Sequence, residues 1–151
     1  MLVSTGFALL AQQSDADRKL LAVVRDKAEK GDAQSQFELA DAFAVGCLGL
    51  TKNEADAVKW YREAAEQNLA AAQFRLGVCY EFGQGVAKDE VDAVKWYRKA
   101  AEQNHPWAQW TLGGCYEDGR GVVNDEVDAS LKPVKPQLRT GTGVSEGADV
   151  G

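Results

Sequence analysis

The sequence is poor in the residues that support metal, redox and acid–base chemistry. It holds one His and three Cys in 151 residues, and no two Cys stand in a Cys-x-x-Cys spacing. Zinc sites use several His and Cys ligands, and general acid–base catalysis most often uses His. We therefore predict no metal site, no cofactor and no catalytic residue, and His105 is expected to serve an inter-repeat turn.

Two further shortages narrow the class of protein. Acidic side chains outnumber basic ones, 23 to 17, which gives a net charge of -6, whereas a nucleic-acid-binding domain usually presents a basic face. No apolar run approaches the roughly 20 residues of a membrane-spanning helix. Hydrophobic residues still make up 45% of the chain, enough for one core. We expect neither a nucleic-acid partner nor an integral membrane segment.

What the chain does contain is an internal repeat. Trp60-Tyr61-Arg62 recurs 36 residues later as Trp96-Tyr97-Arg98, and the segment 76–81 recurs in the same register as 112–117. A more divergent copy aligns residues 28–39 with 65–76 at an offset of 37, the extra residue falling in the loop between Gly46 and Thr51. A period of this length is typical of stacked helical repeats.

Each copy predicts two helices. Apolar spacing predicts the first over 70–82 and the second over 90–103. The second helix is expected to begin after a capping side chain, in the three copies Asn53, Asp89 and Asp125. It should end where a left-handed residue is tolerated, at Gly31, Asn68 and Asn104. The predicted fold is all-α, a right-handed α-solenoid of antiparallel helix-turn-helix repeats of about 36 residues over 14–130.

These residues resemble a known repeat. The pattern Ala-x-x-x-Leu-Gly-x-x-Tyr-x-x-Gly-x-Gly-Val, then Asp-x-x-x-Ala-x-x-Trp-Tyr-x-x-Ala-Ala-Glu-Gln, is similar to the Sel-one-like repeat and covers about residues 28–129. That family is related to the tetratricopeptide repeat. The resemblance implies a non-enzymatic scaffold or adaptor for protein–protein or protein–peptide interaction, often in bacterial envelope, secretion or signalling systems.

The N-terminal residues do not repeat. Residues 1–13 are apolar and read as an arm or a signal-like segment, although no Lys or Arg precedes them. A periplasmic or secreted location and a cytoplasmic one are both open. A helix is expected to start at Ser14 or Asp15 and run to Glu29, taking the place of a second helix of a pair.

The third copy stops halfway. Lys132 and Pro133 stand where its Trp and Tyr are due, and residues 131–151, with two Pro and a Gly-rich end, are predicted to be a disordered tail. Without a full second helix, Leu112, Cys115 and Tyr116 should lie uncovered. This end is expected to self-associate, to bind a partner or to fray. Alternatively, the chain is a truncated fragment of a longer array.

Three motifs have both a chemical and a structural interpretation. Cys79 and Cys115 are one repeat apart, too far for a disulfide, and we interpret them as small buried residues. The Gly-x-Gly motifs at 83–85 and 119–121 are interpreted as helix-to-loop junctions that need positive φ, rather than as phosphate cradles, because they follow a helix. Recurring carboxylates are interpreted as caps and solvated faces.

The positions that vary between copies are the best candidates for partner contacts. They lie on the first helix of each pair, which lines the concave groove in the related tetratricopeptide stacks. The candidates are Phe37, Asp41, Phe74, Arg75, Val78, Trp107, Trp110 and Glu117. Phe37, Phe74 and Trp110 would form an aromatic row that could bind an extended or helical peptide. Phe37 and Phe74 could instead pack in the core between repeats.

A second class of function is weighed beside the scaffold. Related cysteine-rich repeat proteins suggest a bacterial envelope protein that binds or hydrolyses β-lactam or cell-wall compounds. The chain has no Ser-x-x-Lys nucleophile and no His-based catalytic pair, which favours the scaffold.

Overall fold

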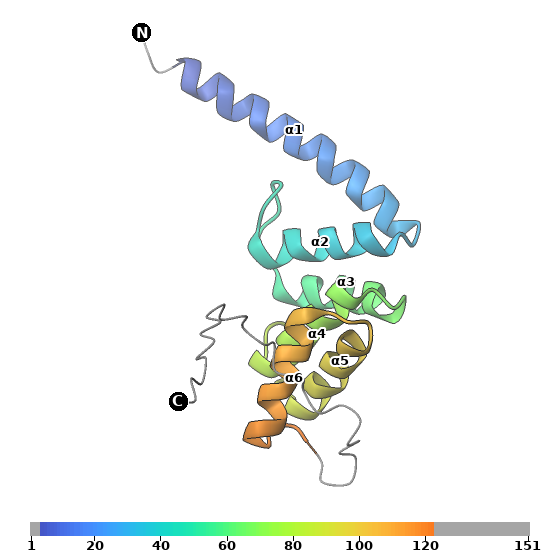
Figure 1. Ribbon diagram of the computed structural model, residues 1–151. Helices are drawn as coiled ribbons and strands as arrows, with labels where there is room; N and C mark the ends of the chain where they lie inside the picture. Colours follow the sequence, from blue (N-terminus) through green and yellow to red (C-terminus); the bar gives the residue numbers. More distant parts are fainter. Residues whose placement is uncertain (1–3, 123–151) are drawn as a thin grey trace, which may run out of the picture.

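The computed structural model describes residues 4–122, with side chains from residue 14 onward, as a row of six helices (Figure 1). They are α1 (Ser4–Glu29), α2 (Ala33–Val45), α3 (Glu54–Glu66), α4 (Ala70–Phe82), α5 (Glu90–Glu102) and α6 (Pro106–Asp118). The main contacts join helices that are consecutive in the chain. The described part contains no strand, and the predicted all-α solenoid is confirmed.

The helices alternate between two types. The first-type helices α2, α4 and α6 each open a repeat, and the second-type helices α3 and α5 each close one. Helix α1 occupies a second-type position before the first complete pair. The predicted tail at 131–151 lies outside the described residues, as do Lys132 and Pro133.

The predicted ends of the second-type helices are confirmed. The Asn53 side chain accepts from the backbone N–H groups of Ala55 and Asp56, and Asp89 does the same at the start of α5. Left-handed residues follow these helices where the sequence predicted them, at Gly31, Asn68 and Asn104. The remaining predicted cap, Asp125, lies outside the described residues.

The start of α1 corrects one prediction. A helix beginning at Ser14 or Asp15 was expected, but α1 already begins at Ser4 and extends past the end of α2 (Figure 1). Residues 7–13 are Phe, Ala, Leu, Leu, Ala, Gln and Gln, and most of these have high helix propensity. No Pro interrupts them, so the favoured capping residue Ser14 lies inside the helix rather than at its start.

His105 caps a first-type helix. Its Nδ1 accepts from the Ala108 N–H at 3.3 Å, and Pro106 follows as the first residue of α6. The imidazole also stacks on the Phe74 ring, with centroids 5.0 Å apart. Burial lowers the pKa of His105, which favours the neutral ring that an accepting Nδ1 requires. The role of His105 at the inter-repeat turn is thus structural.

Small residues allow the helices of a pair to cross closely. A Cβ added to Gly77 on α4 would lie 2.6 Å from Tyr97 Cε1 on α5, closer than real contacts allow. Ala40, Ala64 and Ala100 are fully buried. The Tyr97 ring therefore takes the space that a side chain at position 77 would need.

A ladder of glutamines ties each repeat to the one before. Gln73 lies on α4, and its Nε2 donates to the Ala65 carbonyl at 3.2 Å, while its Oε1 accepts from Gln103 Nε2 at 2.7 Å. Gln36 is equivalent, donating to the Ala28 carbonyl and accepting from Gln67. Each ladder glutamine therefore satisfies a carbonyl at the end of the preceding second-type helix.

Candidate functional site

The predicted aromatic row divides into packed and exposed members. Phe37 contacts Tyr61 with ring centroids 5.9 Å apart, and Phe74 contacts Tyr97 at 5.6 Å. Both phenylalanines are half-buried and pack against the cores of their pairs. Their rings thus lie between helices rather than on an open groove.

Trp110 has the same position in the third repeat, but its ring partner is absent from the sequence. The residue equivalent to Tyr61 and Tyr97 is Pro133. Trp110 is 63% exposed and Trp107, one turn earlier on α6, is 66% exposed. These two rings are large apolar groups in contact with solvent, whereas Phe37 and Phe74, the equivalents of Trp110, are half-buried.

The expectation that Leu112 and Cys115 lie uncovered is wrong. Both are buried, because their face of α6 points toward α5 and packs with Ala93 and Tyr97. Tyr116 is half-buried beside them. On α6 the tryptophans are therefore exposed, whereas the residues that continue the core are buried.

Each pair of helices holds a cluster of tyrosine, carboxylate and arginine. In the first, Tyr61 OH donates to Asp41, and Arg75 Nε lies 3.9 Å from the same carboxylate. In the second, Tyr97 OH donates to Glu81 at 2.6 Å, and Arg120 Nη1 lies 2.6 Å from Glu81. Sequence reasoning missed this second cluster, for which the recurring Tyr was the available signal.

Burial and the neighbouring carboxylates hold both tyrosines in the neutral form. Desolvation raises the pKa of Tyr61 and of Tyr97 far above the ordinary value, and the hydrogen bonds to Asp41 and Glu81 add to the shift. The hydroxyls therefore act as stable donors, which fix the carboxylates, and the carboxylates in turn hold the arginines.

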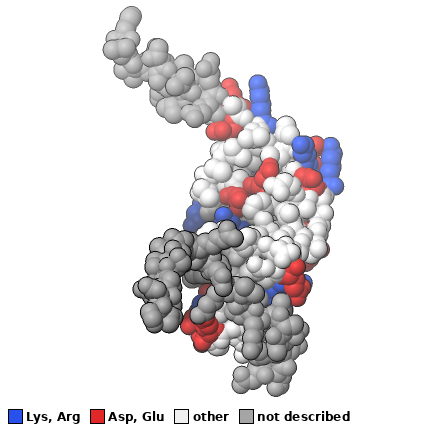
Figure 2. All heavy atoms as spheres, in the orientation of Figure 1, with Lys and Arg blue, Asp and Glu red and all other residues white. Residues whose placement is uncertain are grey.

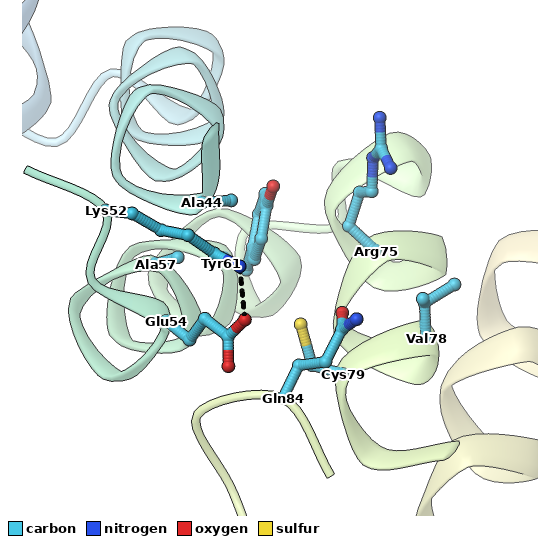
Figure 3. Close-up of a pocket in the computed structure, with 9 residues that line it drawn as sticks. All are labelled: Ala44, Lys52, Glu54, Ala57, Tyr61, Arg75, Val78, Cys79 and Gln84. Carbon is cyan, nitrogen blue, oxygen red and sulfur yellow. Dashed lines mark ion pairs between the residues drawn. The ribbon is translucent and has the colours of Figure 1, made fainter. Parts of the chain in front are cut away.

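An open hollow lies beside the first cluster (Figure 3). It has a volume of about 110 Å³ and is enclosed by α2, α3, α4 and the loops that adjoin them. The lining residues are Ala44, Lys52, Glu54, Ala57, Tyr61, Arg75, Val78, Cys79 and Gln84. Ala57, Tyr61 and Cys79 are buried, whereas Lys52, Arg75 and Gln84 are exposed. The hollow thus has a largely apolar floor and a charged rim.

The equivalent place in the next pair is filled, with a volume of only about 10 Å³. The filled hollow is lined by Glu81, Glu90, Ala93, Val94, Tyr97, Cys115 and Arg120. Glu81 stands where the open hollow has Ala44, and Arg120 stands where it has Gln84. The ion pair between these two long side chains occupies the space that is open in the first pair.

The Gly-x-Gly loops position Gln84 and Arg120, the middle residues of the two motifs. Gly85 has a φ of +67°, and a Cβ there would lie 2.1 Å from the Glu54 carbonyl oxygen. Gly121 is equivalent, with a φ of +65° and 2.0 Å to the Glu90 carbonyl oxygen. The interpretation of these motifs as junctions with positive φ is confirmed. Each loop lies against the start of the preceding second-type helix, which brings Gln84 or Arg120 to its hollow.

The three cysteines are free thiols, of which two are buried. Cys79 lines the open hollow, and burial raises its pKa to about 11. Burial also raises the pKa of Cys115, whereas Cys47 is exposed. Because the thiolate is the nucleophile, the two buried thiols are poorly suited to covalent catalysis.

Figure 2 shows acidic and basic side chains interspersed on the visible face rather than gathered in a field of one sign. Among the described residues, no group of three or more His, Cys, Asp and Glu is placed to hold a metal ion. Within the same residues, no helix combines the length and apolarity needed to cross a membrane.

The predicted contact residues fall into three places. Arg75 and Val78 line the open hollow, and Asp41 adjoins it through Tyr61 and Arg75. Phe37 and Phe74 are half-buried between helices. Trp107, Trp110 and Glu117 are exposed on α6.

Comparison with protein families gives three matches along the chain. The Sel1 repeat model matches residues 33–69, 70–105 and 108–129. The chain belongs to the Sel1 repeat family. The first Sel1 repeat is the pair α2 and α3, the second is α4 and α5, and α6 opens the third.

Solved structures agree with this assignment. The chain is 43% identical to a Sel1 repeat protein from Oxalobacter formigenes, covering 71% of this chain and 80% of that one, with a TM-score of 0.63. It is 40% identical to c5321, a protective antigen of uropathogenic Escherichia coli with an SLR fold, at a TM-score of 0.66. That match covers 74% of this chain but only 23% of the antigen. No curated protein matches the chain significantly.

Proposed function

We propose that this Sel1 repeat protein is a non-enzymatic scaffold that binds a protein or peptide through its first-type helices. The observation that carries the proposal is the pair Trp107 and Trp110, both about two-thirds exposed on α6. Tryptophan is enriched at the energetic centres of protein interfaces, because it offers a large apolar surface and an N–H donor. Two such rings on adjacent turns form one contact surface.

The remaining exposed contact residues suit a partner with polar as well as apolar groups. Arg75 and Asp41 form an exposed ion pair at 3.9 Å, and Glu117 adds a carboxylate on α6. An exposed ion pair at this distance contributes little to stability, so the Arg75 guanidinium can turn to a partner at small cost, whereas Asp41 stays bonded to the Tyr61 hydroxyl. The raised pKa values of the Cys79 and Cys115 thiols also favour binding over covalent catalysis.

The experiment is a quantitative affinity capture with matched variants. Immobilised wild-type protein is compared with Trp110→Ala and Arg75→Glu, and with Phe82→Ala as the control. Phe82 is 65% exposed, like Trp110, but lies at the end of α4. A partner held by the proposed surface should be lost with Trp110→Ala, on the order of tenfold or more, and kept with Phe82→Ala. If neither Trp110→Ala nor Arg75→Glu alters any captured protein, the proposal should be abandoned.

Self-association through α6 is tested in parallel. Light scattering of the wild type and of Trp110→Ala separates a partner that is a second copy from one that is a different protein. A concentration-dependent mass that falls on substitution of Trp110 would identify a second copy as the partner.

A further inference from the structure

The three first-type helices begin after three different kinds of side chain. Asp32 precedes α2, and its carboxylate accepts from the Ser35 N–H at 2.9 Å. Leu69 precedes α4 and makes no side-chain bond to the helix. His105 precedes α6, and its Nδ1 accepts from the Ala108 N–H at 3.3 Å. Of these three groups, only the imidazole has an ordinary pKa close to neutrality.

The bond at the start of α6 requires a neutral imidazole. The neutral ring has one donor and one acceptor nitrogen, whereas the imidazolium has two donors. Protonation of Nδ1 therefore sets an N–H of the ring against the Ala108 N–H, and it adds a positive charge at the positive end of the helix dipole. Ala108 is fully buried, so water does not reach its N–H in place of the ring. The cap bond and the proton compete for the same atom, His105 Nδ1.

The ring of His105 is also held by the preceding repeat. It stacks on Phe74 with centroids 5.0 Å apart and an interplanar angle of 24°. An aromatic face attracts a cation, so the stacking alone does not exclude the imidazolium. The contact with the Ala108 N–H decides, because any turn of the ring that separates the two donors also loses the cap bond.

No nearby charge compensates for protonation of His105 in the described part of the chain. Arg75 is paired with Asp41, and burial is the one cause that shifts the pKa of His105, in the downward direction. On α6, no charged residue precedes Glu117. The titratable residues within one turn of Phe74 and of Ala100, whose carbonyl accepts from the His105 N–H, are Arg75, Tyr97, Arg98, Lys99 and Glu102. Tyr97 donates to Glu81, Arg98 donates to Tyr116, Lys99 lies over the Trp96 ring, and Glu102 is exposed.

Helix α6 depends on its cap more than α4 does. The uncapped helix α4 packs between α3 and α5, whereas α6 has its main contacts with α5 alone among the described helices (Figure 1). Leu69 shows that a first-type helix of this fold can stand without a side-chain cap. Loss of the cap on α6 should therefore loosen its first turn without unfolding the chain.

We propose that His105 is a proton-sensitive cap, and that protonation of its imidazole in mildly acidic solution releases the first turn of α6. Trp107 lies in that turn and is 66% exposed. The consequence for binding rests on the proposed function, because Trp107 and Trp110 form its contact surface. Since burial lowers the pKa of His105 in the folded chain, the stabilisation by the neutral ring is complete above the unfolded pKa of about 6.5 and is lost as the pH falls below it.

Two variants that copy the other repeats test the inference. His105→Asp copies Asp32 and supplies an acceptor that stays ionised down to about pH 5. His105→Leu copies Leu69 and supplies none. The full chain, labelled with nitrogen-15, is titrated from neutral to mildly acidic solution. The imidazole signals report the tautomer and the pKa of His105, and hydrogen exchange of the Ala108 amide, divided by its intrinsic rate at each pH, reports the first turn. Circular dichroism checks that each variant is folded.

In the wild type, Nδ1 should carry no proton at neutral pH. Protection of the Ala108 amide should fall on the order of fivefold on acidification, in step with the imidazole titration. His105→Asp should keep its protection over the same range, and His105→Leu should have the lower protection throughout. The inference is overturned if the wild-type protection does not change, if His105→Asp loses as much, or if Nδ1 carries the proton at neutral pH.

The consequence for binding is measured by repeating the affinity capture in mildly acidic solution. A partner held through Trp110 at neutral pH should be captured more weakly by the wild type after acidification, and equally well by His105→Asp. Equal weakening of the two proteins would show that the cap does not control the contact surface. If no partner is lost with Trp110→Ala at neutral pH, the proposed function fails, whereas the Ala108 amide still decides whether His105 is a proton-sensitive cap.

Discussion

The contact between Gly85 and the start of α3 leads to a stability prediction with a built-in control. Gly85 has a φ of +67° and a Cβ added there would lie 2.1 Å from the Glu54 carbonyl oxygen. Gly119 has nearly the same φ, +66°, but an added Cβ meets nothing within 4 Å among the residues that the structure describes. The substitutions Gly85→Ala and Gly119→Ala therefore share the conformational strain and differ in the steric clash.

The expected losses in the free energy of unfolding follow from the conformational strain and the steric clash. A left-handed conformation costs a non-Gly residue roughly 1–2 kcal/mol, and Ala recovers about 0.4–1 kcal/mol by restricting the unfolded chain. Gly119→Ala should thus lower the free energy of unfolding by about 1 kcal/mol. Gly85→Ala adds an overpacking term of roughly 1–3 kcal/mol. The atom it meets is a backbone oxygen, which cannot rotate away as a side chain can.

Urea unfolding followed by far-ultraviolet circular dichroism measures both variants under the same conditions. We expect Gly85→Ala to lose at least about 1 kcal/mol more than Gly119→Ala. The same loop carries Gln84, so Gly85→Ala should also disturb the lining of the open hollow and speed the modification of Cys79. Equal losses in the two variants would show that the loop does not lie against Glu54, and the account of the repeat contact would be wrong.

Three further outcomes are expected. In the folded protein a thiol reagent should modify Cys47 but not Cys79, whose pKa burial raises to about 11, and rapid modification of Cys79 would contradict its burial. Because burial and the bond to Glu81 raise the pKa of Tyr97, the stabilisation from its neutral form is complete below the unfolded pKa of about 10 and is lost as the pH rises above that value. Tyrosinate absorbance and loss of helicity should therefore rise together in alkali, and Tyr97→Phe should weaken this coupling. Gln73→Ala should lower the free energy of unfolding by about 2 kcal/mol, because Gln73 is 2% exposed and holds a buried carbonyl. Gln109→Ala, at an exposed residue with one bond of 3.3 Å, should lose less than about 1 kcal/mol in the same urea titration.

The parts of the fold that were predictable from sequence are those fixed by local chemistry. Asn53 and Asp89 cap helices through bonds to residues two and three positions away, so the signal lies within one short window. Because the repeat places equivalent residues at a fixed spacing, a cap or helix end predicted in one copy was also predicted in the next. The start of α1 was missed because Ser14 is a favoured cap, but a longer run of helix formers precedes it.

The candidate site was less predictable, because it depends on which side chains meet across helices. Trp110 and Phe74 are equivalent in sequence, yet only Phe74 has a tyrosine, Tyr97, to pack against. Leu112 also gave a misleading signal. The predicted lack of a full second helix suggested that Leu112 would be exposed, whereas its face is already covered by α5. Periodicity alone does not say which neighbour covers a helical face.

The two tyrosine clusters show how one repeat can change its surface while keeping its core. Tyr61 and Tyr97 both donate to a carboxylate, but Asp41 lies one helical turn earlier in the repeat than Glu81. The arginine also moves, since Arg75 comes from α4 whereas Arg120 comes from a loop. The same three groups are satisfied in both repeats, so stability places little constraint on which positions supply them. That freedom leaves the first hollow open and the second filled, and it is a route by which repeats of one sequence pattern acquire different contact surfaces.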